Sequence, residues 1–92
     1  MELRIISRTD REIKLEITGE DHTLGNLLVK EALVHPDVEY ASYRMPHPLK
    51  NAIEFTLIVK EKASISKTLN DIITNIQREL EEFRRLVEAL EL

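Results

Sequence analysis

The sequence contains no cysteine and no tryptophan, and it has few residues that interrupt secondary structure. Its 92 residues include two glycines and three prolines, and aromatic residues make up 4%. Without cysteine, the chain has no disulfide, no thiol nucleophile and no cysteine metal ligand. The low glycine and proline content, together with 42% hydrophobic residues, favours one globular domain over residues 1–92.

Long apolar runs and an excess of positive charge are also missing. No apolar run approaches the roughly 20 residues that a membrane-spanning helix requires, and residues 1–10 ("MELRIISRTD") lack the pattern of a signal peptide. We therefore expect a soluble, cytoplasmic protein without a membrane partner. The formal net charge is −4. Because a protein that binds nucleic acid by itself usually carries a basic face, we expect no direct nucleic-acid contact.

Apolar and polar residues alternate in the segments that we interpret as strands. Ile13, Leu15 and Ile17 alternate with charged residues, a period of two that predicts a strand with one solvated face. A turn-rich segment over residues 7–11 precedes this strand. Four strands are expected, over residues 1–6, 12–18, 38–45 and 52–60.

Two segments have helical spacing. The first is expected over residues 22–33, with Asp21 or Thr23 as its N-cap and His35–Asp37 ("HPD") ending it. The second begins at Ser64 or Ser66 and ends near Leu92. The order β-β-α-β-β-α predicts a two-layer α+β fold, an antiparallel-leaning four-stranded sheet with both helices on one face.

The last helix is expected to be longer than the domain is wide. About 27 residues span ~40 Å, whereas a compact domain of this length is roughly 30 Å across. Its apolar residues alternate spacings of four and three, with Leu86 beside them: Leu69, Ile73, Ile76, Leu80, Phe83, Val87 and Leu90. This pattern favours a partner for the overhanging end, although the helix could instead bend or fray over its own sheet.

A few residues could carry chemistry. Glu20, Asp21 and His22, assisted by His47 or His35, could form an acid–base or zinc site. We favour a capping role for Asp21 and His22, and we expect no catalytic residue, cofactor, metal or small-molecule ligand. A small enzyme or ligand-binding module remains an alternative.

Two further features are interpreted as structural. Pro46, His47 and Pro48 predict a rigid turn that exposes an imidazole. Tyr40 and Tyr43 are three residues apart in a strand, so they should point to opposite faces. That separation favours packing over base stacking.

Two segments carry a family resemblance. "GEDHTLGNLL" (residues 19–28) and "HPDVEYASYRMPHPL" (residues 35–49), followed by a strand and a long closing helix, resemble the small alpha-like subunits of archaeal RNA polymerase (subunit L). The eukaryotic nuclear polymerases have related subunits. Thr23–Asn26 is also similar to the helix start of the bacterial alpha N-terminal dimerisation domain. The absence of an extension before the first strand favours an archaeal member.

The resemblance implies a function in transcription without catalysis. Family members pair with a larger alpha-like partner (the D polypeptide in archaea) through their first and last helices, and the heterodimer is an assembly platform for the two large catalytic subunits. In the resembling dimers this helix lies at the subunit interface, where Gly25 would let another backbone or a bulky side chain approach closely. A free-standing homodimeric adaptor is the alternative. The residues expected at the partner interface, besides the last helix, are Asp21, His22, Thr23, Leu24, Gly25, Asn26, Leu27, Leu28, Pro46, His47 and Pro48.

Overall fold

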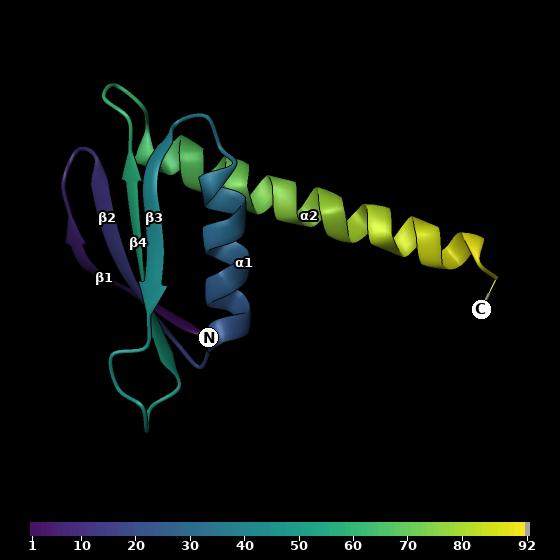
Figure 1. The fold of residues 1–92 in the computed structure, drawn as a ribbon, viewed down its shortest axis with the longest axis horizontal. Coiled ribbons are helices and arrows are strands. Elements are labelled where there is room, and N and C mark those ends of the chain that lie inside the picture. The colour runs from purple at the N-terminus through teal and green to yellow at the C-terminus, as the bar shows by residue number, and fades with distance from the viewer. Residues whose placement is uncertain (92) are drawn as a thin grey trace.

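The computed structural model describes residues 1–91 and has an α+β fold of six elements (Figure 1). The expected order β-β-α-β-β-α is confirmed. Leu92, near which we expected the last helix to end, lies outside the described residues. The elements are β1 (Glu2–Arg8), β2 (Glu12–Thr18), α1 (His22–Leu33), β3 (Val38–Arg44), β4 (Ala52–Val59) and α2 (Ile65–Ala89).

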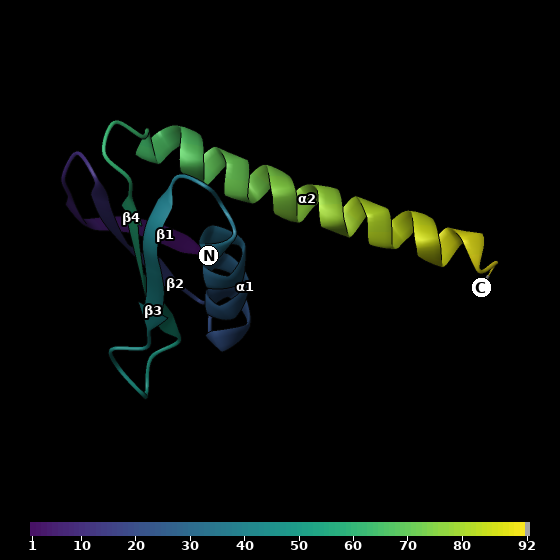
Figure 2. The same ribbon diagram turned by 45° about the horizontal axis from the view of Figure 1, so that its top comes forward.

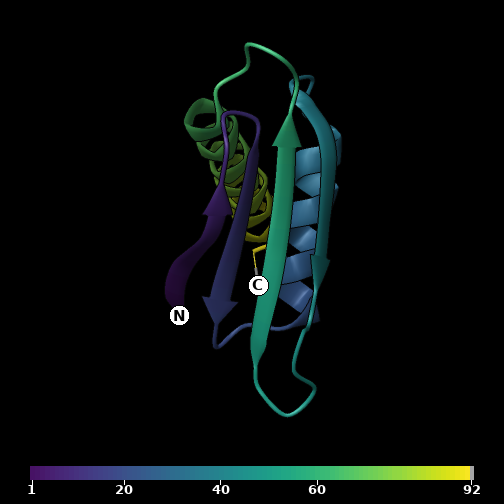
Figure 3. The ribbon, with the colours of Figure 1, turned by 90° about the vertical axis from the view of Figure 1, so that its left-hand side faces the viewer.

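The four strands form one antiparallel sheet in the order β1-β2-β4-β3, with both helices on one side (Figure 3). In the central pair, Leu15 lies opposite Phe55 and Ile17 opposite Ile53. These side chains are buried beneath the helices, as the alternation predicted. Most of the core residues that come from the sheet therefore belong to the central strands β2 and β4.

The edge strand β1 extends further than expected and is poorly covered. The sequence predicted a turn from Ser7 onward, but β1 continues to Arg8 because a bulge after Ile5 lets Ser7 and Arg8 pair with β2. Leu3 and Ile5 lie opposite Ile17 and Leu15, so they face the helix side. Both remain exposed, Leu3 to 64%. The helices thus leave this edge of the inner face open.

Helix α1 begins at an aspartate cap and lies over β3. Asp21 is the N-cap, and its Oδ1 accepts a hydrogen bond from the Thr23 backbone N–H at 3.0 Å. This contact satisfies one of the unpaired N–H groups at the helix start. Ala32 is fully buried against the sheet. One of the two proposed caps is therefore confirmed, and the helix occupies the expected residues.

Helix α2 touches the sheet only with its first turns. Ser64 is its N-cap, and Ile65, Thr68 and Ile72 are its only fully buried residues among those described. The helix has 25 residues, about 38 Å in length. It then projects away from the body (Figures 1 and 2). The radius of gyration is 14.8 Å, compared with about 12 Å for a compact chain of this size, so the predicted overhang is confirmed.

A histidine and an aspartate join α2 to the end of α1. The buried His35 lies just past α1, and its Nδ1 accepts a hydrogen bond from the Asp37 backbone N–H at 3.0 Å. Nδ1 is therefore unprotonated, which leaves Nε2–H to donate to Asp71 Oδ2 at 2.9 Å. Lys67 Nζ also donates to Asp71 Oδ2, at 3.1 Å. The hydrogen bond from His35 to Asp71 ties α2 to the segment that follows α1, whereas the Lys67–Asp71 pair lies within α2.

The substitution Asp71→Asn should lower the midpoint of thermal unfolding at pH 7. The hydrogen bond from His35, then that from Lys67, hold the pKa of Asp71 below its usual range. A lowered folded-state pKa stabilises the fold above the unfolded-state pKa of about 4 and loses this effect as pH falls through the folded-state value. Circular-dichroism melts of both proteins should therefore approach each other as the pH falls below about 4 and coincide only below the lowered folded-state pKa of Asp71. A difference that persists unchanged in acid would contradict this role of the Asp71 charge.

Candidate partner-binding surface

One side of α2 carries a line of apolar side chains that begins in the packed first turns and continues along the free part, and we call it the α2 stripe. Phe83 is 65% exposed and Leu90 is 68% exposed, and Leu80 and Leu86 are similarly open to solvent. Leu69 and Ile76 are half-buried and pack against the core, and Val87 is half-buried further along the helix. The stripe comprises Leu69, Ile73, Ile76, Leu80, Phe83, Val87 and Leu90, with Leu86 beside it.

An apolar notch opens where α2 meets the sheet. Its volume is about 250 Å³, and every lining residue is apolar. The lining comes from both helices and three strands: Met1, Leu3, Leu15, Ile17, Leu24, Leu28, Phe55, Leu69, Ile72 and Ile73. Leu69 and Ile73 belong to both the notch and the α2 stripe. The two features therefore form one connected apolar surface, which is typical of protein–protein contacts.

The start of α1 is held to β3 by polar contacts. The Tyr43 hydroxyl donates to Asn26 Oδ1 at 3.2 Å and lies 2.8 Å from His22 Nδ1. The His22 and Tyr43 rings also pack edge to face, with centroids 5.7 Å apart. His22 and Asn26, expected at a partner interface, thus have intramolecular partners.

Gly25 confirms the expected close approach, but the approaching group belongs to the same chain. A Cβ at this position would lie 2.5 Å from Cδ2 of Tyr43, closer than any ordinary contact. Gly25 is buried beneath that ring. Within the chain, the bulky side chain that approaches Gly25 is therefore that of Tyr43, and a place for Gly25 at a subunit interface stays a prediction. The sequence could not show this because the contact depends on how α1 lies over β3.

The remaining motif residues divide into two groups. Leu24 and Leu28 line the notch and so belong to the connected apolar surface. Leu27 is half-buried and is not among the notch residues, while Asp21 and Thr23 are exposed at the helix start. We did not predict from the sequence that residues of β1 and β2 line the notch, because the alternation of apolar and polar residues does not show which parts of a sheet the helices leave uncovered.

The turn at Pro46, His47 and Pro48 lies in the β3–β4 loop, at the opposite end of β4 from α2 (Figure 1). The Lys50 backbone N–H donates to the His47 carbonyl at 3.1 Å, which closes the turn. Leu49 is fully exposed at the tip. The structure therefore separates this turn from the α2 stripe, and any partner it contacts need not be the one that covers α2.

A pair of carboxyl groups lies where α2 passes α1. Glu31 is only 4% exposed, although it is charged in its usual state. Burial raises the pKa of Glu31, and the adjacent Glu79 carboxyl on α2 raises it further. Leu24, Leu28 and Glu31 are spaced four and three residues apart, which places them on one face of the helix. The sequence therefore indicated that Glu31 lies on the same face as these two leucines, although we did not predict its burial.

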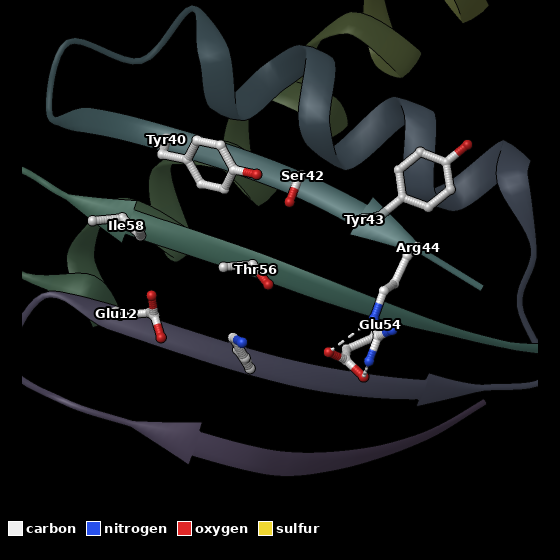
Figure 4. Close-up of a pocket in the computed structure, with 9 residues that line it drawn as sticks. Glu12, Tyr40, Ser42, Tyr43, Arg44, Glu54, Thr56 and Ile58 are labelled. Atoms are coloured by element: carbon white, nitrogen blue, oxygen red, sulfur yellow. Dashed lines mark hydrogen bonds and ion pairs between the residues drawn. The ribbon is translucent and has the colours of Figure 1, made fainter. Parts of the chain in front are cut away.

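The sheet face opposite the helices is polar. A groove of about 320 Å³ lies there, and Figure 4 shows its lining residue Tyr40 and the pair of Arg44 with Glu54. Tyr43 points the other way, toward α1, so the predicted separation of the two tyrosines is confirmed (Figure 4). On the same face, the hydrogen bond from Arg4 lowers the pKa of Glu16.

The residues of the acid–base and zinc alternatives are dispersed. His22 contacts Tyr43, His35 contacts Asp71, and His47 lies in the β3–β4 loop. Asp21 uses a carboxylate oxygen as a helix cap. Among residues 1–91, no three histidine or acidic side chains are grouped so that they could hold a metal ion. The same residues include no helix with the length and apolarity to cross a membrane.

Comparison with known proteins points to one family. A family model for the RNA polymerase Rpb3/Rpb11 dimerisation domain matches residues 12–86. The chain is 33% identical over 91 residues to DNA-directed RNA polymerase subunit Rpo11 of Sulfurisphaera tokodaii, covering 99% of this chain and 98% of that one. It is 33% identical over 95 residues to the probable RNA polymerase II subunit RPB11 of Plasmodium chabaudi chabaudi, covering 91% and 75%.

A solved structure has the same fold. RNA polymerase subunit L from Thermoplasma acidophilum superposes with a TM-score of 0.82 at 23% identity, covering 96% of this chain and 86% of the other. The sheet, the two helices and their order are thus shared with that protein.

The substitution Gly25→Ala should destabilise the isolated chain, although alanine favours helix by ~1 kcal/mol. The new Cβ would displace the Tyr43 ring, and such overpacking costs about 1–3 kcal/mol. Urea unfolding measures the loss. Lys30→Ala, at an exposed position of α1, is the control. The double variant Gly25→Ala/Tyr43→Ala should lose less than the sum of the single losses, and strict additivity would show that the two residues do not interact.

Proposed function

The chain belongs to the RNA polymerase Rpb3/Rpb11 dimerisation-domain family, and we propose from this premise that it is a non-catalytic assembly subunit of DNA-directed RNA polymerase. Its relatives are polymerase subunits across archaea and eukaryotes. Residues 1–92 would act as a single dimerisation domain in the cytoplasm.

The observation that carries this proposal is the uncovered apolar surface formed by the α2 stripe and the notch. A monomer leaves Phe83, Leu86 and Leu90 in water. Burying each such side chain is worth ~1.5–3 kcal/mol. A partner that covers the surface therefore gains several kcal/mol, a large fraction of the stability of a small domain.

The proposed partner is the larger alpha-like polymerase subunit, which in archaea is the D polypeptide. The α2 stripe would pack on a helix of that subunit, and the notch would receive its apolar side chains. The resulting heterodimer would serve as the platform for the two large catalytic subunits. The β3–β4 turn and the polar sheet face lie away from the α2 stripe, so they stay available for those later contacts.

The double substitution Phe83→Asp/Val87→Asp should abolish binding to the larger alpha-like subunit while the isolated chain stays folded. Both side chains lie beyond the last buried residue of α2. Losing two apolar contacts of ~1.5–3 kcal/mol each predicts binding at least about a hundredfold weaker. Light scattering of the chain alone and mixed with that subunit measures complex formation, and circular dichroism checks the fold.

The matched control is Thr74→Asp/Gln77→Asp. It adds the same charge at two exposed positions of α2 outside the stripe, so it should still bind. Equal binding by both variants would show that the stripe is not the interface. A stable homodimer that ignores the larger subunit would favour the homodimeric adaptor instead.

A further inference from the structure

The β3–β4 turn carries a fully exposed leucine on a restrained backbone. Leu49 stands at the tip, and two prolines restrict the chain just before it. After the tip, the Lys50 N–H donates to the His47 carbonyl at 3.1 Å, and the Ala52 N–H donates to the Lys50 carbonyl at 2.9 Å. One exposed leucine is ordinary on a protein surface. On a restrained backbone, however, it can enter a pocket with little loss of conformational freedom on binding.

The base of the turn is joined to the sheet on both sides. Arg44 and Glu54 lie opposite one another as the last β3–β4 pair before the turn, and the guanidinium donates to both carboxylate oxygens, at 3.3 and 3.2 Å. The Gly19 backbone N–H, just after β2, donates to the Asn51 carbonyl at 2.6 Å. The tip therefore projects from a supported base at the end of β4 that is remote from α2 (Figure 1).

The polar groove on the outer sheet face begins at the same arginine. Arg44 lines the groove, as do Lys14, Thr56 and Ser42. Thr56 lies opposite Lys14 on one side and opposite Ser42 on the other, so these three form a row across β2, β4 and β3 (Figure 4). The row offers one ammonium and two hydroxyl groups within a volume of about 320 Å³. None of the side-chain hydrogen bonds and ion pairs found among residues 1–91 uses any of the three.

The charges around this row favour a carboxylate as its ligand. Of the two acids that line the groove, Glu54 is already paired with Arg44, and Glu12 lies beyond the row on the side away from the turn. A carboxylate neutralises the Lys14 ammonium, and its two oxygens can accept hydrogen bonds from both hydroxyls as well. A nucleic-acid strand is disfavoured, because the net charge of the chain is −4 and both acids face the groove.

We propose that the outer sheet face and the β3–β4 turn form a second docking surface, for an acidic segment of one of the two large catalytic subunits. An aspartate or glutamate of that segment binds across Lys14, Thr56 and Ser42, and an apolar pocket of the same subunit receives Leu49. This inference rests on the proposed function, because it concerns the step after heterodimer formation. The α2 stripe and the notch lie on the helix side of the sheet, so the larger alpha-like subunit leaves this surface free.

Leu49→Asp and Lys14→Glu test this surface in the reconstituted assembly. Both variants should pair with the larger alpha-like subunit as the wild type does, because neither position belongs to the α2 stripe or the notch. Titration of each immobilised heterodimer with the purified large catalytic subunits should then show binding at least about tenfold weaker. A charge at the tip cannot enter an apolar pocket without losing its hydration, and a reversed charge in the groove repels the carboxylate.

The controls are Leu49→Met, which keeps an apolar tip, and Lys60→Glu, which reverses a charge at the opposite end of β4. Both should bind as the wild type does. Circular-dichroism melts check folding, and the fully exposed Leu49 keeps the test valid if Lys14→Glu is unstable.

Three outcomes would count against the proposals. Equal capture of the large subunits by the wild type, Leu49→Asp and Lys14→Glu would overturn the inference and leave the proposed function intact. Binding of single-stranded RNA by the wild-type chain that is lost in Lys14→Glu would assign the groove to nucleic acid and overturn it as well. A wild-type heterodimer that captures neither large subunit would instead overturn the proposed function itself.

Discussion

The structure depends on one mismatch, between the length of α2 and the width of the sheet that it covers. Only the first turns of α2, through Ile72, are buried against the core. The rest of the helix extends with its apolar residues in water, and the notch stays open beside its start. An amphipathic helix normally gains its stability from the surface that it covers. Here most of that surface must come from another molecule.

The contacts that the chain does make fix the direction of the free helix. His35 and Asp71 join the end of α1 to α2, and the hydrogen bond from Tyr43 to Asn26 joins β3 to the start of α1. These polar contacts add little to a hydrophobic core of this size, but they are directional. A free helix is useful for recognition only if its orientation is set before the partner arrives, since ordering it on binding would cost affinity.

Much of the fold could be predicted because its signals are local. The alternation of Ile13, Leu15 and Ile17 depends only on neighbouring residues, as does the aspartate cap of α1. Three other features could not be predicted without knowing how the elements are arranged in space. Gly25 beneath Tyr43, the uncovered edge at β1, and Glu31 beside Glu79 each join segments that are distant in sequence. The overhang of α2 was predictable because it follows from a length compared with a domain size.

An incomplete subunit of this kind couples stability to assembly. Any molecule that binds the folded state alone shifts the folding equilibrium in its favour by mass action. The apolar surface determines how large that shift is, because several side chains that are exposed in the isolated chain are buried together on binding. On the proposed function, the isolated subunit would therefore stay marginal and become fully stable only with the partner that covers its exposed apolar surface.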